Sequence, residues 1–560
     1  MDADVAGAKS RLKQNAALVV LGLALAATAA LLLSLASGLT FFQDTWDFLI
    51  NRRGFTARAF LEPHNEHIVV IPVAIEQLLL RLFGMTSAMP EFVVLTAMLL
   101  ATAALVFVYV RRRVGPWPAL VAAVLLLFLG PAWQVLLWPF EIGFVGSTLF
   151  GVAMLLALDR GDRRWDIAAC VCLAISLGFS SLGLAFAVGA VVDVLQGRRR
   201  PGGLRRAYVA AVPLLLYAAW YVGWGHDAES HLSLHNVLVS PRFAAEGLVA
   251  SVDSLLALST IAGEAIGRSI WGVPLLVGLV ALLVYGQVRK PGLSPRLWPV
   301  VAAAATFWFL AAFNYFPGRE AYSSRYLYAG AAFMLLVAAD LLKGVRFGRW
   351  ALLAGGLIAL VAVAFNLTPL REGRDWLKRE TALTRSDLAA LEITHRTVDP
   401  AFVLTPEVAG SSYLANVQAG EYLTAVDEYG SPAYTPAELA NAPEADRQQA
   451  DVVLAHALPI EIETGGNGET ARRGQCVSVP AGTGSTAPPL RLRPGTTKIE
   501  LAPGAPATIR LRRFATSEYP LVTNGIPGGS TTLLRIPSDG AARPWRLQLE
   551  AAQEATVCRP

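Results

Sequence analysis

Charged residues are scarce in this chain of 560 residues, in which Lys, Arg, Asp and Glu together make up 16%. Soluble domains carry about 25% charged residues, and 54% of this sequence is apolar. The composition excludes an ordinary soluble protein and indicates an integral membrane protein. P-loops, dinucleotide-binding glycine patterns and zinc-finger spacings are absent. The net charge is +5, but the arginines cluster in short loops between apolar runs, so nucleic acid is not an expected partner.

Cysteine is rare as well, with four residues in the chain. Cys170 and Cys172 lie inside an apolar run and are expected to pack there as small apolar side chains. Cys476 and Cys558 bracket the last part of the chain, which the topology derived below places outside the cytoplasm. Disulfides persist in that environment, so these two cysteines are predicted to form one.

Apolar runs of about 20 residues recur from residue 16 to residue 367 and then stop, and each can cross a bilayer core of ~30 Å. The first run is too long for a typical signal peptide and is expected to remain as a membrane helix. The sequence thus divides into a membrane domain (1–370), an α/β region (371–470) and a β-sandwich (471–560) of short strands between Gly and Pro turns. Carbohydrate binding and a purely structural role both stay open for the β-sandwich.

Clusters of Lys and Arg mark the loops that face the cytoplasm. They fall at residues 9–13, 111–113, 160–164, 198–206, 289–296 and 343–349. If all are cytoplasmic, an even number of crossings separates each from the next. The stretch 67–83 would break this count, and because it contains Glu76 and Arg81 it is expected to lie on the outer surface as an amphipathic helix. The stretch 167–195 is expected to form two short legs with a break near residues 178–183.

About eleven membrane segments result, with the N-terminus in the cytoplasm and the C-terminal domain outside. The expected fold is a polytopic α-helical membrane domain followed by an extracytoplasmic α/β and β-sandwich domain, in the plasma or inner membrane. Carboxylates, imidazoles and arginines then collect in the outer loops, whereas the inner loops hold mostly arginine. The outer face is therefore where chemistry is expected.

The first outer loop begins with the stretch FFQDTWDFLI, which places Asp44 and Asp47 three residues apart at the membrane border. Loss of water near lipid raises the pKa of a carboxylate and makes it a better base. Such a base can take the proton of an acceptor hydroxyl. A helix end that is exposed to water would explain the two acids without a catalytic role. Both interpretations stay open.

An acid just past the first membrane helix, a surface helix, many further spans and an external C-terminal domain together resemble the GT-C superfamily of membrane glycosyltransferases. The nearest likenesses are the protein O-mannosyltransferases and the lipid A aminoarabinose transferases. The resemblance covers residues 16–367 and is architectural. It implies transfer of a sugar from a polyprenyl-phosphate carrier to an acceptor at the outer face, with the first-loop acid as the base. That role falls on Asp44, and because the adjacent Asp-Glu pair of the family is absent, Asp47 stays an alternative.

The leaving group of such a reaction is a phosphate, which needs cations around it. Arg319 and Arg325 in PGREAYSSRY are the first candidates, because a guanidinium group binds phosphate oxygens in a bidentate manner. Arg52, Arg53 and Arg58 compete for this role. Extension of the side chain toward lipid headgroups is the alternative explanation for Arg325.

The remaining candidates would line the site or contact the acceptor, and they are His64, Glu66, His67, Glu141 and Tyr322. A polar turn that caps the surface helix, with Asn65 as the cap, explains the stretch HNEH equally well. The spacing of its histidines is not that of a zinc protease. No metal ligands are assigned, and a divalent metal stays open as a cofactor.

Inverting sugar transfer is the expected function. The expected partners are a polyprenyl-phosphate sugar, membrane lipid, and an acceptor that is an envelope glycan, lipid or protein. A transporter or flippase for a lipid-linked saccharide is one alternative, and an envelope glycan-binding membrane protein is another. Transporters tend to have internal repeats and charged or broken helices at mid-membrane, whereas this sequence has no convincing repeat and holds its acids at the outer edge.

Overall fold

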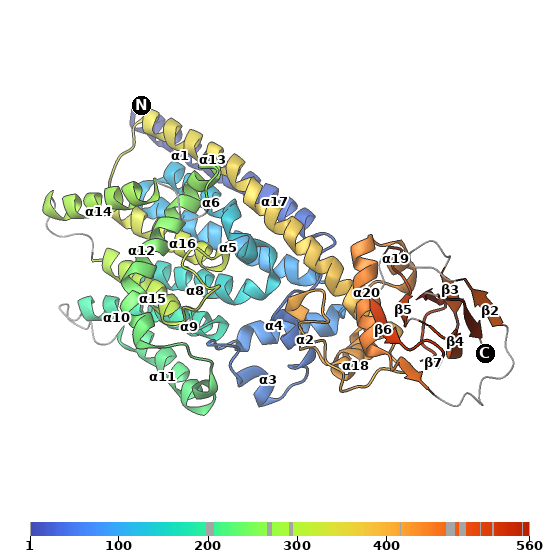
Figure 1. Cartoon of the computed structure of the whole chain (residues 1–560). Coiled ribbons are helices and arrows are strands. Elements are labelled where there is room, and N and C mark those ends of the chain that lie inside the picture. Colours follow the sequence, from blue (N-terminus) through green and yellow to red (C-terminus); the bar gives the residue numbers. More distant parts are fainter. Residues whose placement is uncertain are drawn as a thin grey trace. The chain divides into compact units, whose positions relative to one another are not determined.

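The computed structural model consists of helices up to Ala457 and strands from Glu461 onward (Figure 1). It describes residues 2–197, 206–265, 271–289, 295–414, 416–465, 476–480, 489–504, 506–517, 520–551 and 553–558. Parts of two predicted cytoplasmic clusters, at 198–205 and 290–294, lie outside the described residues.

The chain forms two compact units. The membrane unit comprises Met1–Gly38, Arg52–Leu79 and Met89–Trp376. The C-terminal unit comprises Leu39–Asn51, Leu80–Ala88 and Leu377–Pro560. The main boundary lies close to the sequence-based one at residue 370, but two early segments join the C-terminal unit, and one of them carries Asp44 and Asp47.

Helices make up the membrane unit. Their bounds are α1 (Asp2–Ala36), α3 (Ala57–Leu61), α4 (Val70–Phe83), α5 (Met89–Val114), α6 (Pro116–Leu127), α7 (Trp133–Leu137), α8 (Ile142–Leu158), α9 (Arg163–Phe179), α10 (Gly183–Gly197), α11 (Tyr208–Gly223), α12 (Leu234–Leu256), α13 (Leu258–Ala262), α14 (Gly272–Arg289), α15 (Leu297–Phe313), α16 (Ser324–Leu341) and α17 (Arg349–Ile393). The last part of α4 and of α17 belongs to the C-terminal unit.

Among the described residues, four stretches of helix are long and apolar enough to cross a membrane: Asn15–Ala36, Met89–Val114, Pro139–Leu158 and the helix Arg349–Ile393. The bent pair Pro116–Leu127 and Gly130–Leu137, with an angle of 43°, is a fifth candidate. Helices α10, α11 and α15 are apolar but shorter. The protein thus has a helical, partly apolar membrane unit, and the number of eleven segments stays a prediction.

The break expected within residues 167–195 is present, because α9 ends at Phe179 and α10 begins at Gly183. A side chain at Gly183 would meet the backbone of Leu177, since an added Cβ would lie 2.7 Å from the Leu177 nitrogen. Only glycine therefore permits this close return of the chain.

Helix α12 is not among the elements predicted from the sequence. Asn236 near its start donates hydrogen bonds to the carbonyl oxygens of Phe313 (3.1 Å) and Tyr315 (2.9 Å). Near its end, the carbonyl of Ser254 accepts a hydrogen bond from Asn366 at 2.9 Å. The helix packs against α14, α15 and α16. Its Arg, Glu and Asp residues interrupt the apolar pattern, which is why hydropathy alone missed it.

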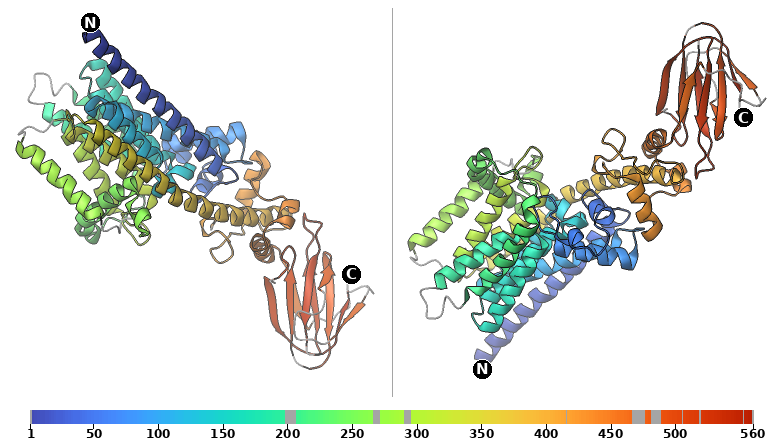
Figure 2. Two further views of the ribbon diagram at one scale, coloured as in Figure 1. Left: turned by 90° about the horizontal axis from the view of Figure 1, so that it is seen from above. Right: turned by 90° about the horizontal axis from the view of Figure 1, so that it is seen from below.

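Two antiparallel sheets form the end of the C-terminal unit. One has the order β1 (Glu461–Thr464), β7 (Thr531–Ile536), β4 (Gly495–Leu501), β9 (Ala555–Cys558) and β2 (Cys476–Val479), and the other has β3 (Leu490–Leu492), β8 (Trp545–Glu550), β5 (Ala507–Arg512) and β6 (Leu521–Ile526). Figure 2 shows the strands of this region lying side by side. Alternate residues of β5 are buried, as expected where one face of a sheet covers another. This is the β-sheet region that the sequence predicts.

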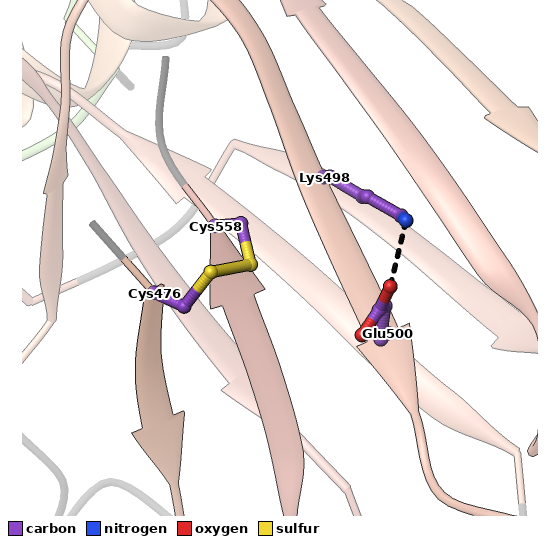
Figure 3. The surroundings of a disulfide bond; sticks show 4 residues. All are labelled: Cys476, Lys498, Glu500 and Cys558. Atoms are coloured by element: carbon purple, nitrogen blue, oxygen red, sulfur yellow. Dashed lines mark ion pairs between the residues drawn. A yellow bond between two sulfur atoms is a disulfide. The ribbon is translucent and has the colours of Figure 1, made fainter. Parts of the chain in front are cut away.

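Cys476 and Cys558 occupy facing positions on the antiparallel strands β2 and β9, and a disulfide joins them (Figure 3). Strand β9 also pairs with β4, where Lys498 and Glu500 form an ion pair at 2.7 Å. The bond therefore fixes an edge strand of the five-stranded sheet to its neighbour.

Before the sheets, the C-terminal unit is helical, with α2 (Thr45–Ile50), α18 (Ala419–Tyr429), α19 (Pro436–Asn441), α20 (Glu444–Ala457) and the end of α17. Asp451 of α20 accepts hydrogen bonds from the backbone N–H groups of Arg513, Phe514 and Ala515, at 2.7 to 2.9 Å. Helix α20 is thus tied directly to the end of β5.

Candidate functional site

Asp44 and Asp47 lie on the short helix α2. Asp44 is its N-cap residue and Asp47 is in its first turn, where Asn51 donates a hydrogen bond to the Asp47 carboxylate at 2.9 Å. Trp46, between the two acids, is buried and packs edge-on against Tyr422 of α18, with 6.2 Å between ring centroids. Both acids are half-exposed, and the packing of their helix on the C-terminal unit decides where they point.

Glu66, His67 and Arg319 form a charged cluster in the membrane unit. Nη1 of Arg319 lies 2.9 Å from Oε1 of Glu66, and Nε2 of His67 lies 3.6 Å from the same oxygen. Burial lowers the pKa of His67, and although the Glu66 carboxylate raises it, the nearby Arg319 and Arg325 lower it further. Burial raises the pKa of Glu66, but its charged surroundings outweigh that and hold it below the ordinary value. Arg319 carries its charge at every physiological pH, so it is the permanent ionic partner of the Glu66 carboxylate.

Glu66 and His67 lie in a tight turn. His64 and His67 exchange backbone hydrogen bonds at 3.0 and 2.9 Å, and Asn65 between them has a φ of +51°. Asn tolerates this left-handed conformation better than most residues. Asn65 therefore shapes the turn, whereas α4 begins only at Val70, so the alternative interpretation of Asn65 as the cap of this helix is wrong.

Arg325 lies beside the cluster, in the first turn of α16. Its guanidinium group is 5.9 Å from the ring centroid of Trp138. Its charge contributes to the lowered pKa of His67, which places it within electrostatic reach of that imidazole. Within the described ranges Arg325 forms no ion pair with a carboxylate. It is thus a cation available to an anionic ligand, next to Arg319.

Arg52 has a structural task, because its buried guanidinium group donates to the carbonyl oxygens of Glu62 (2.7 Å) and Pro63 (2.9 Å). Arg58 is exposed and forms an ion pair with Glu62 at 3.0 Å. Arg53 is half-buried. These contacts leave Arg319 and Arg325 as the better-placed candidates for a phosphate.

Glu141 and Tyr322 differ in their surroundings. Glu141 is buried at the end of the 3-10 turn η2 (Pro139–Glu141). The preceding residue, Phe140, packs against the ring of His64 with 5.2 Å between centroids, so Glu141 follows directly on a residue that contacts the turn. Tyr322 is partly exposed in the loop before α16.

Ser181, which the sequence analysis did not single out, supports the turn from the break between α9 and α10. Its hydroxyl donates to the Glu66 carbonyl at 3.2 Å, accepts from the Ile68 N–H at 3.4 Å and lies 3.1 Å from the Tyr217 hydroxyl. The expected helix break in GFSSLG was the only sequence signal for it.

Among the parts of the chain that the structure describes, no group of three or more His, Cys, Asp or Glu residues could hold a metal ion. The two histidines of the turn pack instead against aromatic rings, His64 on Phe140 and His67 on Phe144.

Fold and site together define a polytopic helical protein with a partly buried charged cluster between two loops of its membrane unit. No protein-family model matches the chain, and no curated protein matches it either. A crystal structure of ArnT from Cupriavidus metallidurans in the apo state is similar over 75% of this chain and 90% of that chain, with 14% identity and a TM-score of 0.46. The structure of ArnT bound to undecaprenyl phosphate covers 73% and 88%, with 13% identity and a TM-score of 0.43. At these values the likeness assigns neither a family nor an activity to this chain.

Proposed function

We propose that this protein is a membrane glycosyltransferase that transfers a sugar, with inversion, from a polyprenyl-phosphate carrier to an acceptor at the outer face of the membrane. The observation that carries the proposal is the cluster of Glu66, His67 and Arg319 with Arg325 beside it. It joins two loops that the sequence predicts for the outer face, and it supplies the cations that a phosphate leaving group requires.

Arg325 and Arg319 have different roles in this proposal. Arg325 contacts the donor phosphate, because it has an aromatic contact but no carboxylate partner within the described ranges. Arg319 is held by Glu66 at 2.9 Å, so its remaining N–H groups are oriented before the donor binds. Preorganised cations of this kind stabilise charge that develops in the transition state.

Asp44 acts as the general base, with Asp47 as the alternative. The base takes the proton of the acceptor hydroxyl while the hydroxyl oxygen forms a bond to the anomeric carbon. The bond between that carbon and the phosphate oxygen breaks on the opposite side, and its electron pair leaves with the polyprenyl phosphate. An envelope glycan, a lipid or a protein is the proposed acceptor. The N-terminus is cytoplasmic and the C-terminal unit extracytoplasmic in this scheme.

The test compares the envelope glycans of cells with and without this protein by mass spectrometry. We expect one sugar modification to disappear without the protein and to return with the wild-type chain. Asp44→Asn should fail to restore it at equal protein level. Asp227→Asn, at a highly exposed carboxylate that follows α11, is the matched control and should restore it.

Three outcomes would contradict parts of the proposal. If the glycan profile does not change when the protein is missing, the proposed transferase function is wrong. Restoration by Asp44→Asn but not by Asp47→Asn would move the base to Asp47. Restoration by both would favour the transporter alternative, which needs no base. A separate measurement of sugar transfer by membranes with and without a chelator tests whether a divalent metal takes part.

A further inference from the structure

A cavity of about 330 Å³ opens in the membrane unit where α5 ends. It is lined by Arg112, Arg113, Asp159, Arg160, Arg296 and Lys343. These residues come from the end of α5, the turn after α8, the start of α15 and the turn after α16. Five cations thus surround one carboxylate, in segments that the sequence predicts for the cytoplasmic side.

Arg113 lines this cavity and is held in place by its own partners. Its Nε donates to Asp340 at 2.6 Å, and its two terminal nitrogens donate to Asp159 at 3.1 and 3.3 Å. The guanidinium group lies 3.4 Å from the ring centroid of Tyr109, whose hydroxyl donates to Asp340. Arg113 is buried and saturated by these partners, so it shapes the cavity and leaves ligand binding to the other cations.

The other four cations are incompletely neutralised. Arg296 lies 3.5 Å and Arg112 4.0 Å from Asp159, the carboxylate that Arg113 already uses. In the described part of the chain, Arg160 and Lys343 form no ion pair with a carboxylate. Five cations against the two carboxylates Asp159 and Asp340 leave a net charge of +3. Repulsion among like charges this close is offset when an anion binds.

We propose that this cavity binds a phosphate group, namely that of an anionic phospholipid headgroup. Guanidinium groups match phosphate oxygens in geometry and charge. Basic pockets between membrane helices on the cytoplasmic side are suited to such headgroups. Arg112, Arg160, Arg296 and Lys343 contact the phosphate, and Arg113 holds the turns that carry them.

Exposed tryptophans place the cavity at headgroup depth. Trp165, Trp298 and Trp350 are 42%, 46% and 71% exposed, and they follow cavity-lining residues in the sequence, Trp165 after Arg160, Trp298 after Arg296 and Trp350 after Lys343. Arg160 packs on the Trp165 ring, 5.0 Å from its centroid. Exposed tryptophan is typical of the interface between membrane and water. A lipid phosphate is therefore favoured over a soluble one.

This site is separate from the Glu66–Arg319 cluster. Helix α15 has 17 residues and runs from Arg296 at the cavity toward the loop that holds Arg319. At 1.5 Å per residue that is roughly 25 Å. The inferred site is therefore distinct from the proposed transfer site, and its test needs no transfer assay.

The test uses the purified full chain in a neutral detergent. Native mass spectrometry measures bound lipid, and thermal unfolding measures stabilisation, with phosphatidylglycerol, phosphatidylcholine of the same acyl chains, and inorganic phosphate as separate probes. The cavity variant is Arg160→Gln with Lys343→Gln, two exposed cations. The matched control is Arg164→Gln with Arg346→Gln, which removes the same charge from exposed residues outside the cavity lining.

We expect phosphatidylglycerol to bind and to raise the unfolding temperature more than phosphatidylcholine does. Its affinity should fall about tenfold or more in the cavity variant, the effect of losing a charged hydrogen bond, and remain unchanged in the control. Equal loss in both variants, or no loss in either, would overturn the proposal. Stabilisation by inorganic phosphate alone, lost in the cavity variant, would identify a soluble phosphate ligand and overturn the lipid assignment.

Discussion

Glu66 and Arg319 are 253 residues apart in the chain, yet their side chains form an ion pair at 2.9 Å. The pair connects the turn before α4 to the loop between α15 and α16. Its side chains are only 16% and 13% exposed, so water compensates neither charge well if its partner is lost. The relationship therefore stabilises the cluster and also determines which donors of Arg319 remain for a ligand.

Replacing Glu66 with Gln should destabilise the protein, because Arg319 would be left partly buried without a carboxylate. We expect a loss of about 1–3 kcal/mol in the free energy of unfolding. Glu62→Gln is the matched control, since its exposed pair with Arg58 should contribute less than about 1 kcal/mol. Thermal unfolding of both variants measures the difference, and equal effects would show that the Glu66 pair is no more important than a surface pair.

Replacing Arg325 with Lys keeps the charge but loses the bidentate geometry. The donor phosphate gains charge as the glycosidic bond breaks, so turnover should fall more than donor affinity does. We expect a loss of about ten- to a hundredfold in rate, the value of a strong charged hydrogen bond. Arg58→Lys, at an exposed position, should leave turnover unchanged.

Steady-state kinetics with varied donor separate two outcomes for Arg325→Lys. A raised half-saturation with unchanged turnover would reduce Arg325 to a docking residue. If neither value changes, the phosphate is held elsewhere, and Arg53 is then the next cation to replace.

Stability should decrease with rising pH because of Glu76, which is buried on α4 and faces Glu91. Burial raises the pKa of Glu76 from about 4.5 to about 7. Between these values the folded state holds a proton that the unfolded state has lost, so each step upward in pH favours unfolding. Glu76→Gln should make the profile of unfolding temperature less steep between about pH 4.5 and about pH 7, the window set by these two pKa values.

Glu62→Gln is again the control for this profile, because Glu62 lies in an exposed pair and its replacement should leave the slope in place. A Glu76→Gln variant that keeps the full slope would assign the titration to another group.

The predicted sides of the membrane can be checked with single cysteines in a Cys170→Ala and Cys172→Ala background. Ala57 and Arg346 are both exposed. On intact cells an impermeant thiol reagent should label Ala57→Cys, and it should label Arg346→Cys only after the membrane is opened. The reverse pattern would invert the topology and place the Arg-rich cavity outside.

The sequence predicted features that depend on a few neighbouring residues. The break between α9 and α10 follows from small and polar residues in GFSSLG, and the sheets follow from alternating patterns between Gly and Pro turns. The disulfide followed from two cysteines that bracket this region, and the structure shows them on paired strands. Such features need no knowledge of distant contacts.

Features that depend on distant contacts were missed. The sequence did not show that the helix of Asp44 and Asp47 belongs to the C-terminal unit, because this depends on the packing of Trp46 on Tyr422. Arg52 looked like a phosphate ligand because its backbone partners at residues 62 and 63 leave no mark in the sequence. Helix α12 was hidden because its polar residues find partners on α15 and α17.

The disulfide closes a covalent ring, because its two cysteines are 82 positions apart and the strands β3 to β8 lie between them. One backbone cut anywhere inside this ring would leave both pieces joined through the sulfur atoms. A protease could therefore cut one of these strands or loops without releasing any part of the two sheets. Only cleavage together with reduction, or a second cut, would release a fragment, so the nick would appear on a gel only after a reducing agent is added.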